Sequence, residues 1–241
     1  MTMPLSLFCD AMGIETLPIG VYDAPDPELF APMVPLKQCI FDHYQDFQSG
    51  AAVVLDPTVK GCPGCGYWML GKMRFPSREA MVTFLTDKEG LRENSGLTEA
   101  WLGAHPTFPP RNGYIAIGPV SGERMKFLRT VTFFVNPDQL SALIYGANYH
   151  AHPDDPEPVL ATWGSGCGQM YNLFPDLSRA QAIIGATDVA MRQHIPPDLL
   201  AFTVTVAMLE RLLSLDDGHS FLGKSFLSQL KLARKRRSTI S

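Results

Sequence analysis

Short apolar runs alternate with helical patterns along the whole chain. Runs bounded by glycine or proline predict strands at residues 18–22, 51–55, 114–117, 131–135 and 158–163. Apolar positions at helical spacing predict helices over residues 36–47, from Tyr67 onward, from the cap Ser77 to Leu85, from 136 to about 149, and over 198–213. This mixture of strands and helices indicates an α+β fold.

A cysteine framed by glycines occurs twice in the chain. Gly64-Cys65-Gly66 in the first half corresponds to Gly166-Cys167-Gly168 in the second. Two further matches keep nearly the same separation, from Pro35 to Pro137 and from the Ser77-Arg78 pair to the Ser178-Arg179 pair. Three landmarks in one register predict an internal duplication. Two related halves around a shared core would then bring the two glycine-cysteine loops close together.

The duplication and the turn formers suggest where the chain divides. Prolines, glycine and asparagine gather at residues 105–113, which marks the best internal boundary. We therefore expect a first α/β half over residues 1–110 and a second over 111–197. A C-terminal helical segment would cover 198–230, followed by a basic tail over 231–241 that is expected to be disordered.

Composition excludes several classes of function. Of 241 residues, 46% are hydrophobic and 18% are charged, and the formal net charge is -4. That balance predicts no general attraction to nucleic acid or to an anionic membrane surface. Without a leader pattern or a long apolar run, the chain is expected to be cytoplasmic and not membrane-bound. The expected partners are a small-molecule ligand or a redox partner, and a homodimer stays open.

The five cysteines carry the candidate chemistry. An odd number in a chain of this length does not indicate a disulfide framework. Cys62-Pro63-Gly64-Cys65 is a C-x-x-C motif, whose spacing lets two thiolates reach one metal. Cys167 and Cys39 are the candidates to complete the site, which predicts an iron–sulfur cluster or zinc. In this hypothesis backbone amides approach the sulfurs at the flanking glycines, Gly64, Gly66, Gly166 and Gly168.

Other interpretations of the same residues stay open. Cys62 and Cys65 also fit a dithiol oxidoreductase, since a helix start can lower a thiol pKa. The glycine loops can instead hold a small molecule or an anion without metal, although Gln169 replaces the third glycine of a dinucleotide fingerprint. Cysteines can also be plain core residues. We expect His43 on a helix surface, the run 150–155 as a solvated turn, and the basic run 234–237 as a solvated tail.

The motifs resemble the domain of unknown function 169 family of bacterial and archaeal proteins. The resemblance rests on Met12-Gly13-Ile14 with Pro18-Ile19-Gly20-Val21, Cys39, Cys62-Pro63-x-x-Gly66, Asn136-Pro137-Asp138-Gln139-Leu140, Gly166-Cys167-Gly168 and Ile195-Pro196. It implies a shared thiolate site at three cysteine positions, which are Cys39, Cys62 and Cys167 here. Cys65 stands where the family pattern leads us to expect a small residue. The hypothesis for function is therefore a cysteine-lined metal site that serves electron transfer or small-ligand binding.

Overall fold

Seven strands form one mixed sheet in the computed structural model, which describes residues 2–56, 58, 61–105, 107, 109–171, 176–215 and 219–238. The strands are β1 (Ile19–Ala24), β2 (Val53–Leu55), β3 (Tyr114–Pro119), β4 (Leu128–Val135), β5 (Val159–Ala161), β6 (Ala182–Gly185) and β7 (Leu200–Thr205). Their order across the sheet is β2-β3-β1-β4-β7-β6-β5. Neighbours are antiparallel except for β5 and β6, which are parallel.

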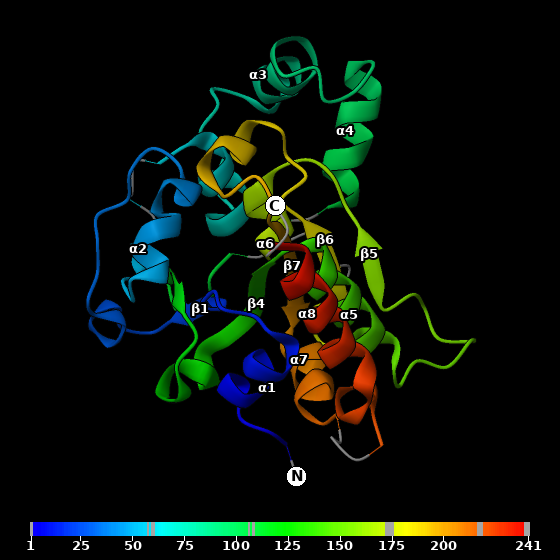
Figure 1. Cartoon of the computed structure of the whole chain (residues 1–241). Helices are drawn as coiled ribbons and strands as arrows, with labels where there is room; N and C mark the ends of the chain where they lie inside the picture. The colour runs from blue at the N-terminus through cyan, green and yellow to red at the C-terminus, as the bar shows by residue number, and fades with distance from the viewer. Residues whose placement is uncertain are drawn as a thin grey trace.

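One face of the sheet is covered by helices from the two ends of the chain and from its middle. They are α1 (Leu5–Met12), α5 (Pro137–Asn148) and α7 (Val206–Leu213), with the C-terminal α8 (Ser225–Ser238) beside them (Figure 1). Because side chains alternate along a strand, Phe133 and Val135 enter this core while Phe134 enters the opposite one. This first core supports the sheet and contains none of Cys62, Cys65 and Cys167.

The opposite face carries short helical segments from the middle of the chain. These are η2 (Ile40–His43), α2 (Tyr44–Gln48), η3 (Cys65–Met69), α3 (Arg78–Thr83), α4 (Ser95–Ala104) and α6 (Gly166–Tyr171). Figure 1 shows α3 and α4 at the end of the molecule farthest from the N-terminus. Further short helical segments are η1 (Pro27–Phe30), η4 (Phe84–Lys88), η5 (Gly122–Phe127), η6 (Ala190–His194) and η7 (Phe221–Gly223). This second face holds the cysteines of interest.

The mixed fold and most predicted elements are confirmed. The five predicted strands correspond to β1, β2, β3, β4 and β5. Helix α5 begins where the sequence predicts, because Asn136 and Gln139 each accept the other's backbone N–H in a capping box. Ser77 caps α3 by accepting the N–H of Ala80.

The C-terminal third differs from the prediction. The helix expected over 198–213 begins only at Val206, because the alternating, β-branched run Leu200–Thr205 forms the inner strand β7. The tail expected to be disordered is helical as far as Ser238, and Arg234 pairs with both carboxylate oxygens of Asp138 at 2.6 and 2.7 Å. Residues 239–241 lie outside the described residues. Within the described part of the chain, no helix is long and apolar enough to cross a lipid bilayer.

Two other expectations about the organisation change. The helix expected over 36–47 begins only at Ile40, because Cys39 is extended and the Asp42 carboxylate accepts its N–H at 2.9 Å. Cys39 therefore precedes the helical segment instead of lying on it. Strand β3, which the boundary at 110 assigns to the second half, pairs with β1 and β2 of the first. The division into two halves and the duplication itself stay predictions.

Candidate metal centre

Three cysteine sulfurs meet on the face of the sheet that carries the short helical segments. The Sγ atom of Cys65 lies 3.4 Å from that of Cys167 and 3.6 Å from that of Cys62. All three Sγ atoms lie within 4.8 Å of one another, and we call this group the sulfur centre. Cys65 and Cys167 are buried, and Cys62 is half-buried. Two segments that are 102 residues apart in the sequence thus supply one compact set of sulfurs.

Local hydrogen bonds hold the first two sulfurs in place. The Cys62 N–H donates to the Gln38 carbonyl at 2.9 Å, which ties the C-x-x-C loop to the segment before Cys39. The Cys65 N–H then donates to the Cys62 sulfur at 3.4 Å at the start of η3. Cys167 enters from α6, which packs against η3. The loop and the two helical segments therefore fix the sulfur positions through the backbone.

Two of the four flanking glycines donate their backbone N–H groups to oxygen atoms. The Gly166 N–H donates to the Asp188 carboxylate at 3.0 Å, and the Gly66 N–H donates to the Cys62 carbonyl at 3.3 Å. These two amides do not serve the sulfurs. Gly64 lies close to the centre, since a Cβ there would be 3.6 Å from the Cys62 sulfur. Gly168 is buried within α6. At these positions the absence of a side chain mainly allows neighbouring groups to pack close to the backbone.

The four nearby thiols share their protons unequally. Hydrogen bonds with Cys167, Cys39 and Cys65 lower the pKa of Cys62, which favours negative charge on this residue. Its thiolate, together with burial, raises the pKa of Cys39 and of Cys167. The hydrogen bond with Cys167 lowers the pKa of Cys65, but the Cys62 thiolate and burial outweigh it and raise that pKa to about 12. The interactions within the metal-free centre therefore favour the thiolate form at Cys62 and the thiol form at the other three cysteines.

A cavity of about 470 Å³ opens beside the sulfur centre, within the size range of small-molecule sites. Cys39, Cys62 and Cys167 lie in its wall. Most of the remaining wall is apolar, with six aromatic side chains: Phe41, Tyr67, Trp68, Phe75, Phe84 and Trp101. A small molecule in this cavity can therefore reach the sulfurs.

The sequence did not point to several polar groups of this cavity. Asp188 accepts the N–H groups of Gly166 and Ala190, both at 3.0 Å. His194 pairs with Asp42 at 2.8 Å, and the other oxygen of that carboxylate holds Cys39. Asp188 lies two residues before the first residue of η6, a position at which an aspartate side chain commonly stabilises a local turn. That pattern predicts the turn alone and not its place beside Cys167.

Comparison with known families decides the affiliation of the chain. Residues 8–214 match the family described as DUF169, uncharacterised ArCR. The chain belongs to the DUF169 family. No curated protein and no solved structure gives a match. The resemblance drawn from the cysteine and proline motifs is thereby confirmed.

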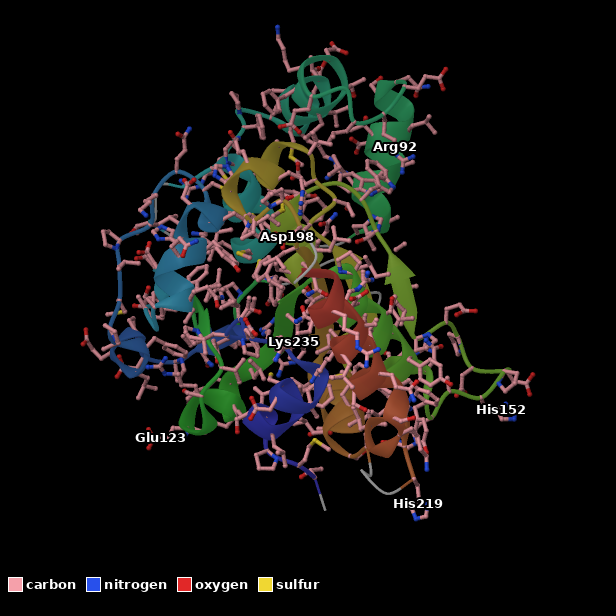
Figure 2. All side chains as sticks on the ribbon, viewed as in Figure 1. Arg92, Glu123, His152, Asp198, His219 and Lys235 are labelled. Atoms are coloured by element: carbon pink, nitrogen blue, oxygen red, sulfur yellow. The ribbon has the colours of Figure 1, made fainter. Side chains whose placement is uncertain are left out.

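The remaining sequence-predicted residues of this DUF169 protein lie outside the sulfur centre. Cys39 hydrogen-bonds to Cys62 without belonging to the group of three. His43, expected on a helix surface, is fully buried, where its Nε2 accepts the Lys37 N–H at 2.9 Å and its Nδ1 faces Asp46 at 2.8 Å. Figure 2 shows His152 far from the helical face, at the tip of the loop between α5 and β5.

A methyl group at Gly166 tests how tightly this region of the DUF169 protein is packed. A Cβ at this position would lie 2.4 Å from the Met191 sulfur and 2.8 Å from Phe41 Cε2. We expect Gly166→Ala to lower the free energy of unfolding by about 1–3 kcal/mol, because a filled core must shift to admit it. Urea denaturation measures the change. Gly122→Ala is the control, since a Cβ there meets nothing within 4 Å, and equal effects of the two substitutions would contradict the prediction.

Proposed function

We propose that this protein binds a soft metal centre through Cys62, Cys65 and Cys167, and that it uses the adjoining cavity to bind a small molecule beside it. The observation that carries the proposal is the meeting of three sulfurs from distant segments within 4.8 Å. Thiolate ligands select metals such as zinc, copper(I) and the iron of iron–sulfur clusters. Bystander thiols have no need to converge in this way.

The residues fit a single metal ion. Thiolates bound to one tetrahedral Zn²⁺ at about 2.3 Å lie roughly 3.8 Å apart. The sulfur separations of 3.4 and 3.6 Å are within a few tenths of an ångström of that value. Three protein ligands leave the fourth position for water or another molecule, as in catalytic zinc sites. The cavity wall at Cys62 and Cys167 is where such a position can be reached.

An iron–sulfur cluster is the second form of the same proposal. The observation that favours it is the neighbouring Cys39, which would give four cysteines around one space next to a cavity of about 470 Å³. A cluster needs its thiolates farther apart than a single ion does, because they bind different irons. The sulfurs would then have to separate toward the cavity.

Purification without oxygen, followed by iron, zinc and sulfide analysis with a visible spectrum, tests the proposal. Zinc at about one ion per chain supports the single-ion form. Iron with matching sulfide and a broad absorption near 400 nm supports the cluster. A folded chain that holds no metal, and takes up none when Zn²⁺ or iron and sulfide are supplied, would overturn both forms.

The dithiol hypothesis has one observation in its favour. The Cys62 pKa is lowered by its thiol neighbours, and Cys65 lies 3.6 Å away, so a thiolate stands next to a second thiol. A Cys62–Cys65 disulfide found by mass spectrometry in metal-free protein would favour this function over metal binding.

The strand order supports the proposed duplication. Strands β1 and β4 lie side by side and antiparallel at the middle of the sheet. Outward from them come β3 and β7, each antiparallel to its inner neighbour. The cysteine segments follow β2 on one side and β5 on the other. A twofold relation between β1 and β4, with β6 as an addition, would produce this order and would place the boundary after β3.

A further inference from the structure

The charged groups of the cavity are mostly acidic. Glu89, Asp188 and Asp42 lie in its wall, and no lysine or arginine of the described residues does. His194 already pairs with Asp42 at 2.8 Å. Asp188 receives the backbone N–H groups of Gly166 and Ala190, and no lysine or arginine of the described chain forms an ion pair with it. Among the described residues of this wall, acidic groups therefore outnumber basic ones.

The negative groups also act on one another. Desolvation comes first in raising the pKa of Glu89, and the charges of Asp188 and Cys62 raise it further. Two carboxylates thus line the same space, Glu89 just after η4 and Asp188 just before η6. Three thiolates around a divalent ion would keep one excess negative charge at this end. A cation that enters the cavity relieves this repulsion, and an anion increases it.

The aromatic wall suits a cation as well. Trp68 and Trp101 pack edge to face with ring centroids 5.4 Å apart, and both are nearly fully buried. Trp101 stacks on Trp163, and the Arg92 guanidinium lies 3.9 Å from the centre of that ring. Arg92 Nε is buried and has no acceptor among the described residues, and the Trp163 ring face lies against this guanidinium. The Arg92 side chain is therefore a cation that already contacts the Trp163 ring of this stack.

We propose that the cavity binds a small organic cation, with its apolar body against Trp68 and Trp101 and its positive charge between Glu89 and Asp188. This inference rests on the proposed function, because the cavity is the one that opens onto the sulfur centre. The indole rings give the apolar body of the ligand a large contact area, and the two carboxylates stabilise its positive charge. The acidic side chains add electrostatic selection against neutral and anionic molecules of the same shape.

Calorimetric titration of the protein as purified tests the inference with three probes. Benzyltrimethylammonium is the cation, benzyl alcohol the neutral molecule and phenylacetate the anion. We expect the cation to bind at least about tenfold more tightly than benzyl alcohol, and phenylacetate not to bind. Equal binding of the cation and the alcohol, preference for phenylacetate, or no binding of any probe would each overturn the inference.

Matched variants test whether the cation binds in this cavity. Glu89→Gln should weaken the cation about fivefold and leave the affinity for benzyl alcohol unchanged. Glu123→Gln removes the same charge at the opposite end of the molecule from Arg92, as Figure 2 shows, and should change neither affinity. Equal affinities for the cation in the two variants would contradict the assignment. Metal content measured on the same samples decides the proposed function separately, because neither substitution touches a sulfur.

Discussion

Replacing Cys167 with serine is expected to lower metal affinity at least about a hundredfold and to leave purified protein nearly free of metal. A serine hydroxyl stays protonated at neutral pH, and its oxygen is a poor ligand for a soft metal. Cys167 is buried, its sulfur lies 3.4 Å from that of Cys65, and no other cysteine follows Cys65 in the sequence. Metal analysis and a competition titration with a coloured chelator measure the loss.

Two further cysteines provide the controls. Cys9 is buried beside Phe8 on the other face of the sheet, so Cys9→Ser should retain the metal. Cys39→Ser should also retain it, because the Cys39 pKa is raised by its hydrogen bond to Cys62 and a serine hydroxyl can donate the same bond. Circular dichroism shows whether each variant is folded. Full metal content in folded Cys167→Ser would contradict the site, and its loss in Cys39→Ser would make Cys39 a fourth ligand.

Metal affinity is expected to rise about a hundredfold for each pH unit around neutrality. The lowered pKa makes Cys62 a thiolate already, whereas the raised pKa values keep Cys65 and Cys167 protonated. Binding through all three sulfurs then releases two protons. Protons compete with the metal as pH falls, so affinity decreases toward acid. This pH dependence applies between the lowered pKa of Cys62 and the pKa of Cys65, which is about 12.

Zinc titrations over about pH 6.5 to pH 8, corrected for the protonation of the competing chelator, measure this slope. A slope near two in log affinity against pH agrees with a single preformed thiolate. A slope near three would show that Cys62 is protonated in the metal-free protein, and a slope near zero would move the metal to other ligands. Cys9 adds no proton, because burial and Asp10 raise its pKa to about 11 and it lies outside the centre.

The sequence predicted the sulfur centre better than the cavity beside it. Cys62 and Cys65 are linked by local spacing, and the repeated glycine-cysteine pattern drew attention to Cys167. Trp101 and Asp188 reach the same place from α4 and from the segment before η6, far along the chain. No local sequence motif identifies these two residues as part of the cavity, because their position depends on how α4 and η6 pack over the sheet.

Errors in the predicted elements have local causes. The apolar face of α7 continues backward into Leu200–Thr205, whose alternation fits a strand better than a helix. In the same way, the apolar spacing of 36–47 does not reveal the cap at Cys39. There the Asp42 carboxylate accepts the backbone N–H, and the helical segment begins at the next residue. Capping side chains decide such boundaries, and hydrophobic spacing alone does not show them.

The distance of 102 residues between Cys65 and Cys167 bears on how the protein matures. A chain emerging from the ribosome exposes Cys62 and Cys65 long before the third sulfur has been synthesised. At that stage β1 also lacks its neighbour β4, so the surface that holds α6 does not yet exist. A metal held by all three sulfurs, as proposed, can therefore bind only after α6 has been synthesised and packed on the sheet. A truncated product ending before α6 would contain only two of the three sulfurs of the centre, Cys62 and Cys65.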